Sequence, residues 1–254
     1  MRFGVCGDYQ DAGLLRKCGY DYIEMSLANT ALMEAENFQK CRRYLAEQDM
    51  KAEAFNGLFD SRIHRLTGEA ANHAAIVEYA KAAMERAALL GGKVLVMGSG
   101  GARCIPEGFP RREALKQVSA LLSALGDVAE SFDLDVTIEP LCKAGDNLIT
   151  NAREAVEVIR MTKHPRVRLM VDIYHEYVEC GSLDYLKTME EKPIHLHISN
   201  PMTRYCPRPD DEFHYEVIAS VLKEIQYDGR ISVECFWREM ETDIRQAMTV
   251  LRNM

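Results

Sequence analysis

The fold is decided by four apolar stretches of the chain: DVTIEPL (residues 135–141), VRLMVDIYH (167–175), PIHLHIS (193–199) and RISVECF (230–236). Each stretch has the length and composition of a buried β-strand. Each also ends on side chains that can bind a metal or transfer a proton: Glu139, Asp172 with His175, His197 and Glu234. In a parallel barrel, polar residues at the C-terminal ends of successive strands point at one common spot. Because like charges in a partly dry pocket need a neutralising cation, the pattern predicts a divalent metal site.

Short apolar runs alternate with longer stretches of helical periodicity eight times along the chain. The strands are expected at Phe3–Cys6, Tyr22–Ser26, Ala52–Asn56, Val94–Met97, Asp135–Glu139, Arg168–Asp172, Ile194–Ile198 and Ile231–Glu234. The clearest helices are expected at Ala74–Leu90, Arg111–Phe132, Ala152–Thr162, Tyr215–Ile225 and Glu239–Arg252. We therefore predict an α/β fold, a single-domain (β/α)8 TIM barrel over residues 1–254, with a doubly wound open sheet as the alternative.

The charge balance argues against a general affinity for nucleic acid or for anionic membranes. The chain has 31 basic and 39 acidic residues, a formal charge of -8. No run approaches the about 20 apolar residues of a membrane span, and the start MRFGVCGDYQ lacks the pattern of a signal peptide. The eight cysteines are scattered and form no CxxC pair, so most are expected to be free and buried. We expect a cytoplasmic protein, with a homo-oligomer left open.

The position of each polar residue on its strand suggests its role. Glu139 precedes Pro140, which marks the end of a strand; taken alone, this glutamate could simply pair with a neighbouring Lys or Arg. Asp172 and His175 are three residues apart and can reach one ligand. His195 and His197 face the same side of their strand, so His197, nearer the mouth, is the better metal ligand and His195 is expected to be a hydrogen-bonded core histidine.

The loop GSGGARCIPEGFP (98–110) follows the fourth expected strand and carries three early glycines and Arg103. Consecutive backbone N–H groups in such a turn can form an anion nest, and arginine adds a planar fork for phosphate or carboxylate. The simpler interpretation is a flexible turn with a surface arginine. We include Arg103 among the candidate substrate-binding residues.

Several motifs together resemble a known family: MRFGVCGD, YDYIEMS, VTIEPL, MVDIYH, HLHIS followed by Arg204, and YDGRISVE. Over essentially the whole chain they are similar to the sugar phosphate isomerase/epimerase family of xylose isomerase-like barrels, which is related to ketose 3-epimerases and hydroxypyruvate isomerases. The resemblance implies one Mn²⁺, Mg²⁺ or Co²⁺ ion, with Zn²⁺ also open. Its implied ligands are Glu139, Asp172, His197 and Glu234, and its implied substrate-binding residues are His175 and Arg204.

Two departures from the ketose 3-epimerase pattern bear on the reaction. Those enzymes have a further glutamate six residues after the strand-5 glutamate, where this chain has Gly145. Their arginine follows the metal-binding histidine by six residues, whereas Arg204 follows His197 by seven. The resemblance therefore supports the shared metal chemistry more than it supports 3-epimerisation.

The expected chemistry is isomerisation or epimerisation of a small sugar or sugar phosphate. A metal would stabilise the enediolate formed when a proton leaves the carbon next to a carbonyl. Glu139 and Glu234 are the candidate catalytic acid-base pair. The donor set is rich in oxygen, whereas structural zinc sites are rich in sulfur. It therefore favours Mn²⁺ or Mg²⁺, with Mn²⁺ as the first choice.

Three other functions use a similar barrel. An inosose-type dehydratase would remove the same kind of proton and then expel hydroxide. An endonuclease IV-like enzyme would need additional histidines at the ends of early strands, where this chain reads FNGLF and MGSGG. A non-catalytic sugar-binding barrel would not need both Glu139 and Glu234.

Overall fold

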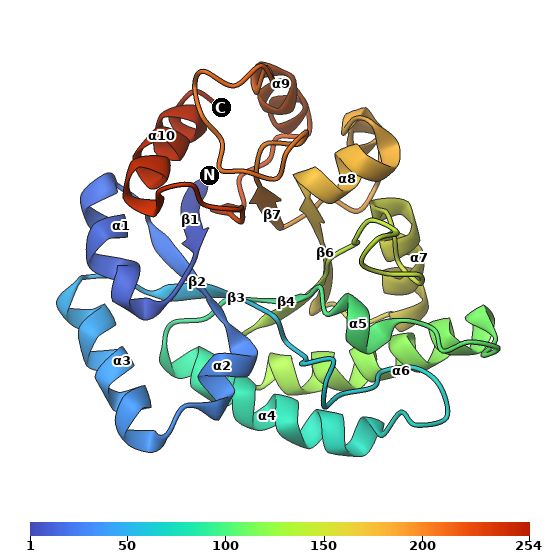
Figure 1. Cartoon of the computed structure of the whole chain (residues 1–254). Coiled ribbons are helices and arrows are strands. Elements are labelled where there is room, and N and C mark those ends of the chain that lie inside the picture. The colour runs from blue at the N-terminus through green and yellow to red at the C-terminus, as the bar shows by residue number, and fades with distance from the viewer.

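Eight parallel strands close into one barrel in the computed structural model, which describes residues 1–254 (Figure 1). The strands are β1 (Arg2–Cys6), β2 (Tyr22–Ser26), β3 (Ala52–Asn56), β4 (Val94–Met97), β5 (Asp135–Ile138), β6 (Val167–Asp172), β7 (His195–Ile198) and β8 (Arg230–Val233). Each strand pairs with its neighbours in the sequence, and β8 pairs with β1. The predicted TIM barrel is confirmed, and the open sheet is wrong.

A ring of helices surrounds the strands in Figure 1. The helices are α1 (Ala12–Cys18), α2 (Leu27–Leu32), α3 (Ala35–Glu47), α4 (His73–Leu89), α5 (Gly100–Arg103), α6 (Arg111–Glu130), α7 (Ala152–Thr162), α8 (Ile173–Cys180), α9 (Glu216–Glu224) and α10 (Met240–Arg252), with short 3-10 turns η1 (Tyr9–Asp11) and η2 (Asp184–Thr188). The five helices expected from periodicity match α4, α6, α7, α9 and α10. Residues 98–110, expected as a loop, contain the single turn α5.

Local sequence signals account for where the helices begin and end. Asn151 caps α7 by accepting a hydrogen bond from the Glu154 N–H at 3.1 Å, which satisfies one of the free donors at the helix start. Gly19 ends α1 in the left-handed region, at φ 88°, where a side chain would be strained. Such signals return the chain to the next strand and so keep the eight strand ends together.

The barrel is filled rather than hollow below its mouth. Interior side chains from four strands form a small apolar layer of Tyr22, Ala54, Val94, Val96 and Met170. The Tyr22 hydroxyl also hydrogen-bonds the Ser232 hydroxyl at 2.8 Å, across the join between the first and last parts of the chain. Sixty other buried residues form the core between the barrel and its helices. The polar residues at the strand ends therefore rest on a packed floor.

Strand register brings the candidate site residues side by side. Asp172 on β6 pairs with His197 on β7, and His197 pairs with Ser232 on β8. β1 adjoins β8 in the closed barrel, and Cys6 on β1 pairs with Glu24 on β2. No helix of this protein is both long enough and apolar enough to cross a membrane.

Candidate metal centre

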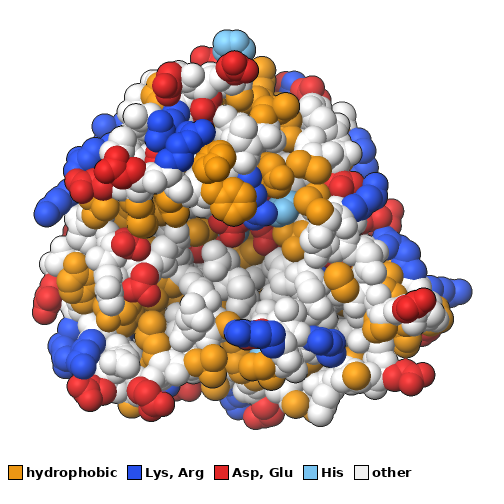
Figure 2. Space-filling model, viewed as in Figure 1, with side chains coloured by type: hydrophobic (Ala, Val, Ile, Leu, Met, Phe, Trp, Pro, Cys, Tyr) orange, Lys and Arg blue, Asp and Glu red, His pale blue; other side chains and the backbone are white.

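The four candidate metal ligands meet at the C-terminal mouth of the barrel. Glu139 follows β5, Asp172 ends β6, His197 lies on β7 and Glu234 follows β8. Each offers one ligand atom, and these atoms all lie within 4.8 Å of one another. In Figure 2, viewed in the same direction as Figure 1, acidic atoms lie in a hollow near the middle of this face. The structure thus brings together the four residues that the strand ends predicted.

The two carboxylate oxygens of Asp172 have different surroundings. Oδ1 accepts hydrogen bonds from the N–H groups of Tyr174 at 2.7 Å and His175 at 3.3 Å, and so caps α8. Oδ2 is buried and has no hydrogen-bond partner. A buried carboxylate oxygen without a partner is costly. A cation among these ligands would remove that cost, so the residues fit a divalent metal.

The His197 ring connects the ligand cluster to a buried glutamate, Glu24, that was not among the predicted site residues. Its Nδ1 lies 3.2 Å from Glu139 Oε1 and 3.4 Å from Glu234 Oε2. Its Nε2 lies 2.9 Å from Glu24 Oε1, and the other Glu24 oxygen lies 2.8 Å from His195 Nε2. The expectation that His195 is a hydrogen-bonded core histidine is confirmed. The signal for Glu24 was a charged residue inside the apolar strand YIEMS.

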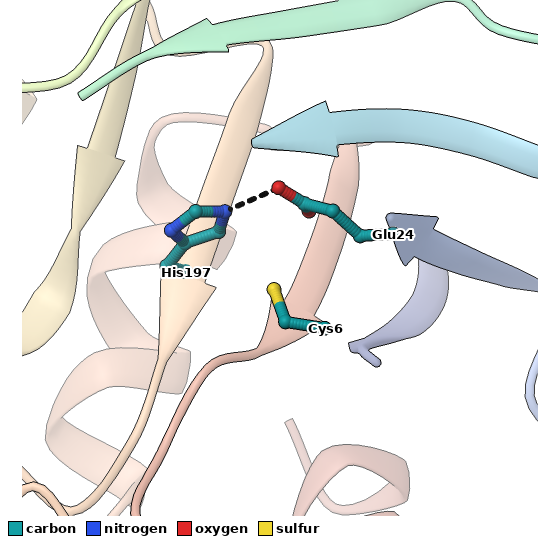
Figure 3. A group of neighbouring side chains, drawn as sticks. All are labelled: Cys6, Glu24 and His197. Carbon is teal, nitrogen blue, oxygen red and sulfur yellow. Dashed lines mark hydrogen bonds and ion pairs between the residues drawn. The ribbon is translucent and has the colours of Figure 1, made fainter. Parts of the chain in front are cut away.

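The Cys6 thiol lies beside the Glu24 carboxylate and the His197 ring (Figure 3). Figure 3 shows the Glu24 carboxylate directed at the His197 ring, with the Cys6 thiol beside both. The three side chains offer ligand atoms close enough to hold a metal themselves. However, this group offers three ligand atoms and the other offers four, and burial and the charge of Glu24 raise the pKa of the Cys6 thiol well above its usual value, so a metal here would have to displace the thiol proton. The group with four ligands is therefore the better metal site.

The carboxylates of the cluster differ in their electrostatic environment. Burial raises the pKa of Glu139, and burial together with the charges of Glu234 and Glu139 raises the pKa of Asp172 well above its usual value. Burial acts in the same direction on Glu234, but His197 and Arg204 outweigh it and lower the pKa of Glu234 to about 2. This crowding of negative charge is the condition that a bound cation relieves.

His175 lies on the first turn of α8, beside the cluster. Its Nδ1 accepts a hydrogen bond from the Cys142 N–H at 3.2 Å, so the ring proton is on Nε2, 3.7 Å from Asp172 Oδ2. Burial, followed by the charge of Arg204, lowers the pKa of His175 to about 4. At neutral pH His175 is therefore an uncharged hydrogen-bond donor.

Arg204 reaches the site despite its shifted position in the sequence. Its guanidinium lies 3.4 Å from Glu234 Oε2. It also stacks over the rings of Tyr174, at 5.2 Å, and Phe236, at 5.8 Å. These contacts hold a positive charge at the edge of the carboxylate cluster.

Arg103 does not take the role expected from its loop. Its side chain is fully buried and pairs with Asp146 at 2.6 Å. It also donates to the carbonyl oxygens of Met97, at 2.7 Å, and Glu139, at 2.7 Å. The backbone N–H groups of Arg103 and its neighbours are used within α5. The expectation of an anion-binding residue is therefore wrong, because the guanidinium joins the ends of β4 and β5 instead.

A cleft of ≈ 240 Å³ opens onto the cluster from the side of β3 and β4. Its lining residues are Asn56, Gly57, Gly98, Ser99, Gly100, Glu139, Leu141, Arg204 and Glu234. Three of these are glycines, so one wall is largely backbone. The cleft offers carboxylate, amide and hydroxyl groups to a small polar ligand, and Arg204 is its only Lys or Arg.

Comparisons with known proteins agree with this architecture. The chain is 24% identical over 246 residues to the inosose isomerase of Bacillus velezensis, a match that covers 89% of this chain and 82% of that protein. It superposes with a TM-score of 0.84 on the D-psicose 3-epimerase of Clostridium cellulolyticum crystallised with D-tagatose, at 16% identity, covering 100% of this chain and 98% of the other. The IolI protein with a bound zinc atom gives a TM-score of 0.78 at 21% identity, covering 100% and 97%.

The family model described as xylose isomerase-like TIM barrel matches residues 12–254. The resemblance inferred from the motifs is confirmed, as is the kinship with carbohydrate isomerases and epimerases. The chain belongs to the xylose isomerase-like TIM barrel family.

Proposed function

We propose that this protein is a metal-dependent isomerase or epimerase of a neutral carbohydrate with a carbonyl group next to a hydroxyl-bearing carbon. The observation that carries the proposal is Asp172 Oδ2, which is buried without a partner among Glu139, His197 and Glu234. A cation at this point satisfies the oxygen and neutralises the cluster. The names of the related proteins support carbohydrate isomerisation as the reaction class.

The metal would be held by Glu139, Asp172 through Oδ2, His197 through Nδ1, and Glu234. Three carboxylates and one imidazole favour Mn²⁺ or Mg²⁺, with Mn²⁺ as our first choice. The zinc-bound IolI structure supports a divalent ion and keeps Zn²⁺ and Co²⁺ as alternatives. When bound, the metal polarises the substrate carbonyl and stabilises the negative charge that develops on its oxygen.

Glu139 and Glu234 would carry the proton transfer. Their carboxylates flank the same His197 nitrogen, at 3.2 Å and 3.4 Å. One carboxylate takes the proton from the carbon beside the carbonyl, and the electron pair of that C–H bond moves into the enediolate. Return of the proton to the neighbouring carbon gives an isomer, and return to the opposite face of the same carbon gives an epimer. Acid-base catalysis of this kind is worth roughly 10²–10⁴ in rate.

His175 and Arg204 would orient the substrate. The Nε2–H of His175 is free to donate to a substrate oxygen, because its other nitrogen is held by the Cys142 N–H. Arg204 is held in place by Glu234 and by the rings of Tyr174 and Phe236. His175 lies beside Asp172 and Arg204 beside Glu234, so both can contact a sugar bound at the cluster.

The charges of the cleft favour a neutral sugar over a sugar phosphate. Phosphate sites commonly combine several Arg, Lys or backbone N–H donors. Here Arg204 is the only basic side chain that lines the cleft and it already faces Glu234, while Arg103 is buried against Asp146. A dianionic phosphate bound in the cleft would therefore have no basic side chain left to neutralise it.

The experiment is to incubate Mn²⁺-loaded protein in D₂O with a panel of neutral ketoses, keto-glycosides and inososes, and with phosphorylated ketoses. NMR and mass spectrometry follow the products. Deuterium at the carbon next to the carbonyl, in a product of unchanged formula, supports the proposal. Loss of water would identify a dehydratase instead, and turnover of only the phosphorylated sugars would contradict the neutral-substrate assignment.

The same proposal assigns the enzyme to the cytoplasm. All eight cysteines are free, and free thiols are normal in a reducing compartment. The homo-oligomer expected as an option stays a prediction, which sedimentation of the purified protein would test.

A further inference from the structure

Glu24 is the middle residue of β2 and is fully buried inside the barrel, and it has no part in the proposed proton transfer or metal binding. It is not one of the four candidate ligands, and its hydrogen bond to the cluster is made with His197 alone. Its two oxygens are shared between two fully buried histidines of β7, His195 and His197. A buried carboxylate is costly unless its hydrogen bonds are satisfied. Its position must therefore be explained by what it does to these rings.

His195 determines the direction of the first hydrogen bond. Its Nδ1 is buried and has no partner. A proton on that nitrogen would be a buried donor without an acceptor, so the ring proton lies on Nε2 instead. His195 Nε2–H donates to Glu24 Oε2 at 2.8 Å. Glu24 Oε2 is thus a hydrogen-bond acceptor, and the buried His195 ring sets its position.

The second oxygen faces the metal-binding histidine. Glu24 Oε1 lies 2.9 Å from His197 Nε2, and a carboxylate can only accept there. His197 therefore carries a proton on Nε2. Its Nδ1 faces Glu139 and Glu234, donates to Glu139 Oε1 when no metal is present, and gives up that proton when a metal binds. Were the ring flipped or the tautomer changed, the lone pair needed for the metal would point away from the other ligands.

We propose that Glu24 is a positioning residue, which holds the His197 ring with its Nδ1 lone pair directed at the metal and is itself held by His195. The inference rests on the proposed function, because it assumes a metal at the four-ligand cluster. Groups that hydrogen-bond metal-binding histidines usually change metal affinity by about 10–100-fold when they are altered. If Glu24 only satisfied a buried polar pair, its replacement would change the stability of the metal-free protein and leave metal affinity unchanged.

The test compares metal-free wild-type protein with Glu24→Gln. Glutamine has nearly the same shape but offers one acceptor oxygen and one donor nitrogen, so it cannot accept from both histidines. Tyr22→Phe is the matched control, because Tyr22 lies two residues earlier on the same strand, is fully buried and hydrogen-bonds Ser232 rather than a histidine. Mn²⁺ binding is measured by titration with electron paramagnetic resonance, and folding by circular dichroism of the metal-free proteins.

We expect Glu24→Gln to weaken Mn²⁺ binding by about 10–100-fold and Tyr22→Phe to leave it within about twofold of wild type. Glu24→Asp is the second variant, in case the glutamine protein does not fold. It keeps the charge but draws it back by one methylene, so it should also bind Mn²⁺ more weakly. In the Co²⁺-loaded wild type, the His197 Nε2–H should give a shifted proton signal that is lost in D₂O, and this signal should move or broaden in either variant.

The outcomes separate the inference from the proposal on which it rests. Wild-type protein that binds Mn²⁺, with Glu24 variants that bind it equally well, would overturn the positioning role alone. Wild-type protein that binds no divalent ion would overturn the metal site, and the positioning role with it. Equal weakening by Tyr22→Phe would show a general effect of disturbing the barrel interior and would also overturn the inference.

Discussion

Gly98 and Glu139 approach so closely that a side chain on Gly98 would occupy the space of the carboxylate. An ideal Cβ on Gly98 would lie 1.8 Å from Glu139 Oε2. Gly98 follows β4 and Glu139 follows β5, so the backbone of one strand end shapes the site at the next.

The first prediction is that Gly98→Ala displaces the Glu139 carboxylate and lowers kcat by roughly 10²-fold, since a misplacement of about 1 Å can cost that much. Gly145→Ala is the control, because a Cβ there meets no atom closer than 3.7 Å. Turnover of the best substrate in the panel measures both. Gly98→Ala with wild-type kcat would contradict the proposed role of the Glu139 position.

The second prediction is that the purified protein binds about one divalent ion per chain, because the four side chains form a single site. Chelation should lower the melting temperature, as the carboxylates then repel one another. Asp172→Asn should abolish tight binding while keeping the α8 cap, since an amide oxygen can still accept from Tyr174 and His175. Elemental analysis and calorimetry measure both effects. About three ions per chain would favour an endonuclease-like site.

The third prediction separates proton transfer from folding. Glu139→Gln and Glu234→Gln keep an oxygen near the metal but remove the base, so each should lose roughly 10²–10⁴ in rate. At least one should stop exchanging the substrate hydrogen with D₂O. Glu53→Gln is the control: Glu53 is a buried glutamate that pairs with Arg2 and Arg230, away from the cluster. Near-normal turnover in both site variants would remove these glutamates from the proton-transfer step.

The fourth prediction is that Arg103→Met destabilises the fold rather than substrate binding. It leaves Asp146 as an uncompensated buried charge, which costs about 3–5 kcal/mol in unfolding free energy. Arg111→Met removes an exposed pair with Glu154 and should cost no more than about 1 kcal/mol. Urea denaturation compares the two. A variant as stable as wild type, with a KM raised only for anionic sugars, would restore the anion-binding role.

The fifth prediction concerns Glu176, a fully buried carboxyl on α8 that accepts a hydrogen bond from the Tyr185 hydroxyl. Burial raises its pKa from 4.5 to about 7. The folded state therefore favours the protonated form, so its stabilising contribution is full below about pH 4.5 and is lost as the pH rises through 7. The total change corresponds to about 3 kcal/mol.

Urea denaturation of wild type and Glu176→Gln at about pH 5 and pH 8 tests this linkage. The unfolding free energy of wild type should fall between these two pH values by more than that of the variant, which has no titrating group at this position. Parallel pH dependence in the two proteins would show that Glu176 is ionised in the folded state throughout.

The barrel and its four candidate ligands were predictable from the sequence because their signals are local. A strand shows as an apolar run, and a helix shows as apolar spacing with a cap at its end. Parallel topology then brings every strand's C-terminal end to one face. Glu139, Asp172, His197 and Glu234 could therefore be placed together before any contact between them was known, and the structure brings them within 4.8 Å.

Only the tertiary structure decided the roles of Arg103 and Glu24, because the role of a buried charged side chain depends on the groups that it contacts. Arg103 lies in a glycine-rich stretch that reads as an exposed loop, yet Asp146, 43 residues away, and nearby carbonyl groups enclose it. Glu24 interrupts an apolar strand, and the two histidines that explain it are 171 and 173 residues away. The sequence by itself determined which strand ends carry the candidate ligands. The closed barrel determined which charged side chains line the cleft, such as Arg204, and which are buried beside the site, such as Arg103 and Glu24.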